Sequence, residues 1–197
     1  MIPAVILAGG ASRRMGGGVK PLLPLAGQPM IAHVIARLKG QTEKIAINAN
    51  SGDFSKFGVP VFADSIDGFP GPLAGVLAAM DWSSTQGAAH VVTVAGDTPF
   101  FPSTLIDDLR AGIGGAPVAL AATEEERRLF AQSVFGLWST SLADDLRAAL
   151  TAGTRKVLDF TRPLEAALVP FSIESDPFFN INTPEDLKLA EARVAVG

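Results

Sequence analysis

Short apolar runs alternate with amphipathic stretches along most of the chain. An uninterrupted run such as residues 3–8, PAVILA, is typical of a strand that is buried on both faces of a sheet. The stretch 29–39 instead places its apolar side chains on one helical stripe, with Pro29 suited to the first turn. By the same patterns we expect strands at 3–8, 44–49, 59–64, 90–97, 116–123 and 131–138, an apolar segment at 165–171, and helices at 29–39, 71–82, 102–112, 140–153 and 184–195.

Strands that alternate with helices predict the fold class. We expect an α/β fold with a doubly wound, mainly parallel sheet and helices on both of its faces. A length of 197 residues fits one domain of ordinary size, so residues 1–197 are expected to form a single domain. Ligands bind such sheets beyond the carboxyl ends of the strands. The important loops should therefore follow the strands that end near residues 8, 48, 64 and 97.

Composition narrows the class of partner and of chemistry. The formal net charge of -4 argues against a protein whose main partner is a nucleic acid, because such a protein usually carries a basic face. The apolar N-terminal segment lacks a basic region and soon meets Gly9 and Gly10, so it is interpreted as a buried strand rather than a signal peptide or a membrane span. The absence of cysteine excludes disulfides, thiolate metal sites and thiol nucleophiles, and it is compatible with a cytoplasmic location.

A loop rich in glycine and basic residues, LAGGASRRMGGGVK at 7–20, follows the first predicted strand. Its early glycines let backbone N–H groups approach a ligand closely, and its cations can neutralise phosphate oxygens. The Walker pattern and the G-x-G-x-x-G pattern do not fit the loop. We interpret it as a phosphate-binding loop of another kind, and a flexible, solvated turn is the alternative. The basic side chains are Arg13, Arg14 and Lys20.

Two carboxylates stand at the ends of predicted strands. Asp97 directly follows the most strand-like segment, where a carboxylate is well placed to hold Mg²⁺, and a turn cap ahead of Pro99 is the alternative. Asp64 ends another strand and precedes a tight entry into the helix at 71–82, whose N-terminus could face an anion. For this second segment, ordinary turn chemistry is the alternative.

Asparagines follow two of the apolar segments. Asn48 and Asn50 stand at a strand end, and Asn180 and Asn182 lie in the apolar approach to the last helix. Thr183 has the position of a helix cap, which leaves Asn180 available to a metal or a ligand. The sequence contains no evident Ser/His/Asp set and no dedicated metal motif, and core or surface positions are expected for both histidines.

Five segments resemble the molybdenum cofactor guanylyltransferases, a family of GT-A-like nucleotidyltransferases. The similarity covers nearly the whole chain, and the first segment alone marks only nucleotidyltransferases in general. The sequence departs from the family pattern at Val19, where an acidic residue is usual, and at Gln28 and Gln132. The similar segments, in the family's order, are LAGGASRRMGGGVK (7–20), LAGQPMIAHV (25–34), FPGPLAGVLAAM (69–80), GDTPFFP (96–102) and FNINTPEDL (179–187).

The resemblance implies an activity with GTP and molybdopterin as substrates and Mg²⁺ as cofactor. GMP is transferred from GTP to molybdenum-molybdopterin, which gives the guanine dinucleotide form of the cofactor and pyrophosphate. The implied catalytic residues are Lys20, Asp97 and Arg14, of which the two cations would steady the pyrophosphate. The resemblance also leaves room for transient contact with molybdoenzymes or their chaperones. The implied GTP contacts are Leu7, Ala8, Gly9, Lys20, Asn48, Asp64 and Asp97, with Asp97 also the metal ligand, and the implied pterin contacts are Asn180 and Asn182.

The residues are also compatible with two other functions. One is a related nucleotidyltransferase that uses CTP or another nucleotide with molybdopterin or a sugar phosphate, because the opening loop does not identify the base. The other is a nucleotide-binding delivery partner of molybdoenzymes with little or no catalysis. Nucleotide preference tests the first alternative, and an Asp97→Asn variant tests the second.

Overall fold

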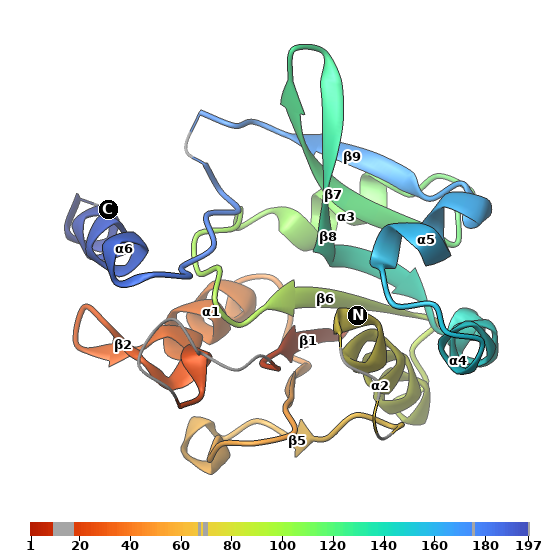
Figure 1. Cartoon of the computed structure of the whole chain (residues 1–197), viewed down its shortest axis with the longest axis horizontal. Coiled ribbons are helices and arrows are strands. Elements are labelled where there is room, and N and C mark those ends of the chain that lie inside the picture. Colours follow the sequence, from red (N-terminus) through yellow and green to blue (C-terminus); the bar gives the residue numbers. More distant parts are fainter. Residues whose placement is uncertain (10–17, 67, 69–70, 175, 197) are drawn as a thin grey trace.

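A seven-stranded sheet forms the centre of the computed structural model, which describes residues 1–9, 18–66, 68, 71–174 and 176–196 (Figure 1). The strand order is β5-β4-β1-β6-β8-β7-β9. Strand β8 pairs antiparallel with both of its neighbours, whereas all other neighbouring strands are parallel. The predicted mainly parallel sheet is therefore confirmed. The strands are β1 (Ala4–Leu7), β4 (Ile45–Asn48), β5 (Val61–Phe62), β6 (His90–Ala95), β7 (Val118–Glu125), β8 (Arg128–Ser139) and β9 (Ala167–Phe171).

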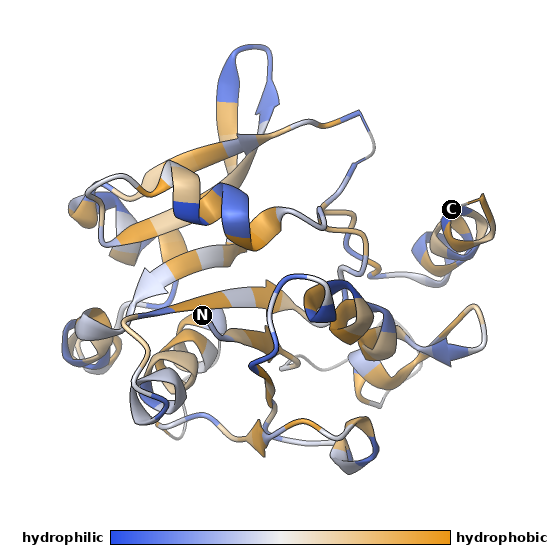
Figure 2. Ribbon diagram, turned by 180° about the vertical axis from the view of Figure 1, so that it is seen from behind, coloured by the Kyte–Doolittle hydropathy of each residue, from blue (hydrophilic) through white to orange (hydrophobic). Residues whose placement is uncertain are grey.

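Helices cover both faces of this sheet, as the alternating pattern predicts. Helices α1 and α3 pack on one face and α2, α4 and α5 on the other, each in its own apolar cluster. Along β1, Ile6 belongs to the first cluster and Val5 and Leu7 to the second, because successive side chains of a strand point to opposite faces. Figure 2 shows the resulting concentration of hydrophobic residues in the strands. The helices are α1 (Met30–Lys39), α2 (Pro72–Thr85), α3 (Leu105–Gly112), α4 (Ala143–Thr151), α5 (Val157–Thr161) and α6 (Pro184–Val196).

Several boundaries differ from the sequence-based prediction. Helix α3 begins at Leu105 rather than at residue 102, and Thr104 takes its cap position. Strand β8 begins earlier than predicted, because its first residues pair with the end of β7 in a hairpin that projects from the body (Figure 1). The polar sequence of that hairpin, EEERR at 124–128, is exposed and therefore lacks the alternating pattern of a half-buried strand.

Short elements account for the remaining differences. The pattern did not predict α5 or the small hairpin of β2 (Pro24–Leu25) and β3 (Gln28–Pro29). That hairpin turns through Ala26 and Gly27, which both have positive φ. Elements of two to five residues are too short to show a hydrophobic period. Among the described residues, no helix combines the length and the apolar character needed to cross a membrane.

The order of the strands places the carboxyl ends of β1, β4 and β6 side by side. The chain runs from β1 outward to β4 and β5, and then returns to the other side of β1 with β6. At such a reversal, the loops after neighbouring strands diverge and leave a crevice that binds ligands in open α/β sheets. The segments that follow Leu7, Asn48 and Ala95 therefore surround one place in the molecule.

Candidate functional site

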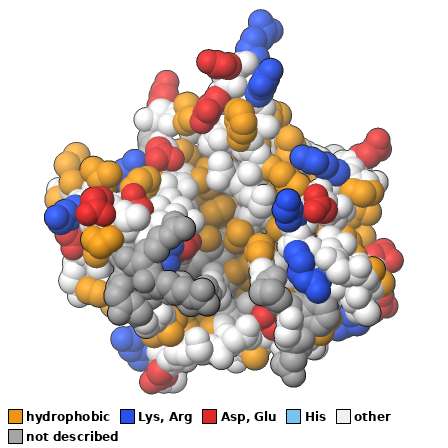
Figure 3. All heavy atoms as spheres, in the orientation of Figure 1, with side chains coloured by type: hydrophobic (Ala, Val, Ile, Leu, Met, Phe, Trp, Pro, Cys, Tyr) orange, Lys and Arg blue, Asp and Glu red, His pale blue; other side chains and the backbone are white. Residues whose placement is uncertain are grey.

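A cavity of about 480 Å³ opens at the carboxyl ends of these strands. The face drawn in Figure 3 is hollowed near the end of β6. Val134 of β8 also lines the cavity, and no sequence pattern predicted it, because the register of an antiparallel strand is set by its partners. The cavity wall includes six of the residues predicted for the site, namely Leu7, Gly9, Asn48, Asp64, Asp97 and Asn180.

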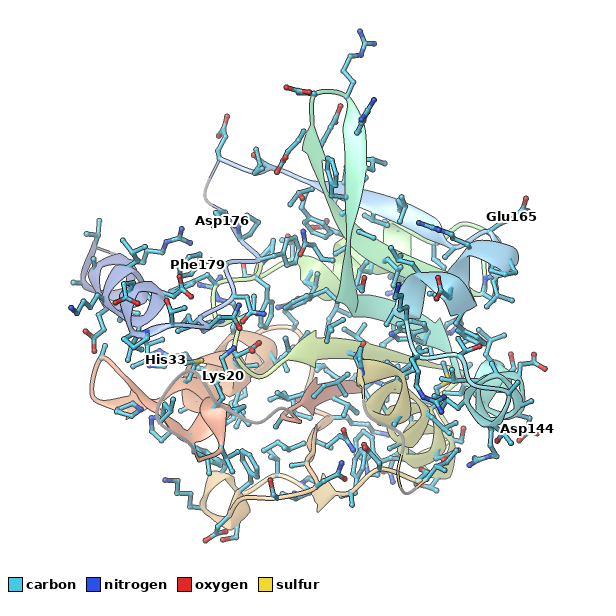
Figure 4. All side chains as sticks on the ribbon, viewed as in Figure 1. Lys20, His33, Asp144, Glu165, Asp176 and Phe179 are labelled. Atoms are coloured by element: carbon cyan, nitrogen blue, oxygen red, sulfur yellow. The ribbon has the colours of Figure 1, made fainter. Side chains whose placement is uncertain are left out.

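The Lys20 ammonium lies at the centre of the first polar cluster of the site, beside the end of β6 (Figure 4). Its Nζ donates hydrogen bonds to Asp97 Oδ2 at 2.5 Å, to Asn182 Oδ1 at 2.6 Å and to Asn180 Oδ1 at 3.1 Å. An ammonium group has three hydrogens to donate, so these contacts use all of them. The exposed fractions of the side chains are only 11% for Lys20 and 22% for Asp97, which strengthens the attraction between their charges.

The local sequence explains how Lys20 reaches β6. Lys20 begins a 3-10 turn, and the next residue, Pro21, fixes the backbone of that turn. Pro21 packs directly on Gly96: a Cβ atom at Gly96 would lie 3.0 Å from Pro21 Cγ. Gly96 therefore lets the turn approach the end of β6 closely enough for the lysine to meet Asp97.

A short connection before α6 carries the two asparagines to the same point. The backbone N–H of Ile181 donates to Asp97 O at 3.1 Å, which fixes the segment against the end of β6. The start of α6 is closed by a reciprocal cap, in which the N–H of Asp186 donates to Thr183 Oγ1 at 3.1 Å and the N–H groups of Asn182 and Thr183 donate to Asp186 Oδ2 at 2.8 Å. The predicted cap role of Thr183 is confirmed by this geometry.

The cap also fixes the charge state at the start of α6. The N–H of Asn182 is the largest of the interactions that hold the pKa of the Asp186 carboxyl below its usual range, and Thr183 and the Lys20 charge act in the same direction. A carboxyl whose pKa is lowered in the folded state stabilises that state at neutral pH. This contribution is lost as the pH falls through the lowered pKa.

A second polar cluster lies where β4 and β5 end. Asn48 Nδ2 donates to Asp64 Oδ1 at 3.0 Å, and Asn50 Nδ2 donates to Asp64 Oδ2 at 2.7 Å. The hydrogen bonds of this group are separate from those of the Lys20 cluster among the described residues, although members of both groups line the same cavity. The cavity thus has a charged side around Lys20 and Asp97 and a second side around Asp64.

Helix α2 approaches the second cluster at a glycine. A Cβ atom at Gly75 would lie 2.6 Å from Asn48 Oδ1, closer than real Cβ contacts come, and 3.2 Å from Leu7 Cδ2, which is tighter than most of them. Gly9 differs, because a Cβ atom there would have nothing described within 4 Å. Gly75 serves packing within the protein, whereas Gly9 borders open space in the cavity.

The resemblance implies that this cavity binds GTP, and on that expectation a Gly75→Val variant should lose most of its nucleotide affinity. The added side chain would displace Asn48, which is only 3% exposed and so has little room to move. It would also fill part of the cavity next to Leu7. A Kd for GTP at least about tenfold higher than that of the wild-type chain is expected, because the displaced amide no longer supports Asp64. Isothermal titration measures the change, and a Gly115→Val variant, at a glycine with open space around it, is the control. An unchanged Kd would contradict the prediction.

Some of the residues predicted for this site do not line the cavity, and others lie outside the part of the chain that the structure describes. Arg14, predicted as catalytic, and Arg13 lie outside the described residues. Ala8 is buried beside the cavity rather than in its wall, and its N–H donates to Asn48 O at 2.9 Å. His33 forms a hydrogen bond with Leu25 O at 2.9 Å, which agrees with its expected role in the core or at the surface.

The Lys20 cluster has the donor chemistry that suits a hard divalent cation. One carboxylate and two amide oxygens already converge on a positive charge, the Lys20 ammonium. Within the described part of the chain, no group of three or more His, Asp or Glu residues could hold a metal by itself. This set fits Mg²⁺, which protein sites commonly bind through one or two carboxylates together with the phosphates of a substrate.

The sequence of the chain is similar to those of known proteins over nearly its whole length. Residues 4–167 match the model of the MobA-like NTP transferase domain. The chain is 45% identical over 201 residues to a molybdenum cofactor guanylyltransferase of Rhodopseudomonas palustris strain BisB5, with 98% of this chain and 94% of the relative covered. Another guanylyltransferase with that name, from Haemophilus influenzae, is 41% identical and covers 95% of this chain and 96% of its own length.

Solved structures with the same fold are more distant in sequence. The crystal structure of molybdopterin-guanine dinucleotide biosynthesis protein A from Archaeoglobus fulgidus superposes with a TM-score of 0.75 at 23% identity, over 100% of both chains. A 4-diphosphocytidyl-2C-methyl-D-erythritol synthase from Anaerococcus prevotii reaches a TM-score of 0.74 at 14% identity and covers 99% of this chain and 96% of its own. At these identities the likeness establishes the fold.

Proposed function

Since the chain belongs to the family of MobA-like NTP transferases, we propose that it transfers GMP from GTP to molybdenum-molybdopterin. A phosphate oxygen of molybdopterin attacks the α-phosphorus of GTP, and the bond to the β-phosphate oxygen breaks. The products are the guanine dinucleotide form of the cofactor and pyrophosphate. The chain is accordingly a nucleotidyltransferase of molybdenum cofactor biosynthesis.

The meeting of Lys20, Asp97, Asn180 and Asn182 is the observation that carries this proposal. These residues come from three segments that are far apart in the sequence, and their side chains meet within hydrogen-bond distance at the cavity. Nucleotidyl transfer needs an oriented pair of phosphates and positive charge beside the pyrophosphate that leaves. A cation held between one carboxylate and two amides, beside a cavity of this size, meets both needs.

Each group has a role in the proposed reaction. Lys20 binds the triphosphate and stabilises the charge that develops on pyrophosphate, with Arg14 as its proposed helper. Asn180 and Asn182, which accept hydrogen bonds from Lys20, are the proposed contacts of molybdopterin. The proposed GTP contacts are Leu7, Ala8, Gly9, Asn48 and Asp64 together with Lys20 and Asp97.

The metal proposed for this reaction is Mg²⁺. Asp97 would hold it, and Asn180 or Asn182 could add an amide oxygen. When bound, the ion neutralises charge on the phosphates and makes the α-phosphorus easier to attack. No covalent intermediate with the protein is required, which agrees with the lack of a recognisable nucleophile in the sequence.

Turnover with labelled GTP tests the proposed function. The purified chain, molybdenum-molybdopterin and Mg²⁺ should yield a labelled dinucleotide and pyrophosphate, and a reaction without the pterin should yield neither. Absence of a pterin-dependent product would reject the proposal. Thermal unfolding with saturating GTP, CTP, ATP or UTP tests the base, because a tightly bound nucleotide stabilises the folded state by about 3 kcal/mol when present at a hundred times its Kd. A larger shift with CTP would favour a cytidylyltransferase.

A cytoplasmic location, one domain over residues 1–197, and delivery of the product through transient contact with a molybdoenzyme or its chaperone remain predictions. Neither a nucleic acid nor a membrane is a proposed partner.

A further inference from the structure

Asn50 contacts Asp64 at two points. Its Nδ2 donates to Asp64 Oδ2 at 2.7 Å, and its Oδ1 accepts from the backbone N–H of Asp64 at 2.9 Å. One exposed side chain thus holds both the carboxylate and the backbone of the same residue. Neither the sequence motifs nor the proposed roles account for this arrangement.

The position of Asp64 depends on such contacts, because the strand before it is short. Strand β5 has only two residues, at the edge of the sheet, and pairs with β4 through Ile47 and Asn48. A two-residue edge strand adds little rigidity of its own. Two asparagine side chains, Asn48 and Asn50, therefore connect Asp64 to the better-anchored end of β4.

The amide donors of this cluster are used within the protein, whereas the carboxylate oxygens of Asp64 can still accept hydrogen bonds from a ligand. Nδ2 of Asn48 donates to Asp64 Oδ1 at 3.0 Å and also lies 3.4 Å from Phe62 O, so its hydrogens point into the protein. Nδ2 of Asn50 is directed at the other Asp64 oxygen. Each carboxylate oxygen can accept more than one hydrogen bond. A ligand at this side of the cavity must therefore supply hydrogens.

The negative charge of Asp64 indicates which part of a nucleotide could lie beside this cluster. The triphosphate is expected at Lys20 and Asp97, and Asn48, Asn50 and Asp64 line the same cavity in a separate cluster. Asp64 brings a negative charge to this second cluster, and the side chains of its described hydrogen-bond partners, Asn48 and Asn50, are neutral amides. A second negative group such as a phosphate would be repelled there, whereas the uncharged nucleoside would not.

We propose that Asn50 is a positioning residue, which holds the Asp64 carboxylate so that it accepts hydrogen bonds from a pair of donors on the nucleoside. Two parts of GTP present such a pair: N1–H with the 2-amino group of guanine, and the 2′- and 3′-hydroxyls of ribose. Asn50 acts only through Asp64 and does not itself touch the nucleotide. This inference rests on the proposed function, because it assumes that the cavity binds GTP.

An Asn50→Ala variant tests the inference through binding rather than turnover. The Kd for GTP, measured by isothermal titration with Mg²⁺, is expected to rise about tenfold, since hydrogen bonds to a charged group weaken when its orientation is lost. In turnover, the KM for GTP should rise while kcat stays within about twofold. The matched control is Asp53→Ala on the same connection, because within the described part of the chain the Asp53 carboxylate accepts its hydrogen bonds from Ser55 and not from Asn50 or Asn48.

Nucleotide analogues separate a positioning role from a general loss of structure. ITP lacks the 2-amino group of guanine, and 2′-deoxy- and 3′-deoxy-GTP each lack one hydroxyl. The wild-type chain should bind at least one of these analogues about tenfold more weakly than GTP, and Asn50→Ala should reduce that difference to about twofold. A difference that shrinks for ITP identifies the base as the donor, and one that shrinks for a deoxy analogue identifies the ribose.

Two results would overturn the inference. One is an Asn50→Ala variant that binds GTP as tightly as the Asp53→Ala control. The other is a variant with weaker binding in which every difference between GTP and its analogues stays at the wild-type value, because Asn50 would then act on the fold alone. Failure of the proposed function looks different, since the wild-type chain itself would then not bind GTP.

Discussion

An Asp97→Asn variant is expected to form the dinucleotide at least about a thousandfold more slowly than the wild-type chain while keeping its fold. Asparagine has nearly the same shape but no negative charge, so the variant loses the ion pair with Lys20 at 2.5 Å. It also loses the carboxylate proposed to hold Mg²⁺, and the amide that replaces it is a weaker ligand for a hard cation. Both losses change the charges around the reacting phosphates, on which the rate of nucleotidyl transfer strongly depends.

The measurement for Asp97 is the single-turnover rate at saturating GTP and Mg²⁺, with circular dichroism to verify the fold. Asp144→Asn is the matched control, because Asp144 is exposed on α4, at the opposite side of the molecule from Lys20 in Figure 4. Its rate should stay within about twofold of the wild-type rate, as is usual for surface positions. An Asp97→Asn rate within tenfold of wild type would favour a binding protein over an enzyme.

Removal of the Lys20 charge is expected to have the second largest effect. Lys20→Met keeps much of the length of the side chain but removes the ammonium that contacts three oxygens. We expect kcat to fall by about a hundredfold or more, because the charge beside the leaving pyrophosphate is lost, and the Kd for GTP to rise as well. Lys20→Arg should restore little, because a planar guanidinium has a different donor geometry from an ammonium.

Steady-state kinetics and titration with GTP check the Lys20 prediction. Lys39→Met is a suitable control, since Lys39 is exposed at the end of α1 and belongs to neither polar cluster. A fall in stability accompanies the Lys20 change because Asp97 loses its partner, so activity is to be compared well below the melting temperature of the variant. A Lys20→Met chain with near wild-type kcat would show that the lysine is structural.

Sequence patterns predicted the strands that are buried in the sheet. The strand before Asp97, β6, is mostly apolar (HVVTVA), and the position of its carboxyl end beside those of β1 and β4 follows from the alternation of strands and helices. The projecting start of β8 was missed because both of its faces are exposed near Arg128 and Leu129, so that no hydrophobic period marks the strand. Local patterns report burial, and they fail where an element has no buried face.

Contacts within the site were harder to predict than its location. The rule for parallel sheets brought the ends of β1, β4 and β6 together. The approach of Lys20 to Asp97 depends in addition on the packing of Pro21 against Gly96, which joins segments far apart in the chain. The contact between Asn50 and Asp64 likewise requires the pairing of β4 with β5. Such contacts arise from tertiary geometry that a single sequence does not display.

The three contacts of Lys20 affect which anions can bind beside it. Its ammonium already gives every hydrogen to Asp97, Asn180 and Asn182. An inorganic phosphate or sulfate ion must break one existing contact for each one that it gains there. A larger ligand that also fills the far half of the cavity has further contacts to offset that exchange. Saturation of the lysine therefore favours a ligand that also fills the cavity over a small free oxyanion.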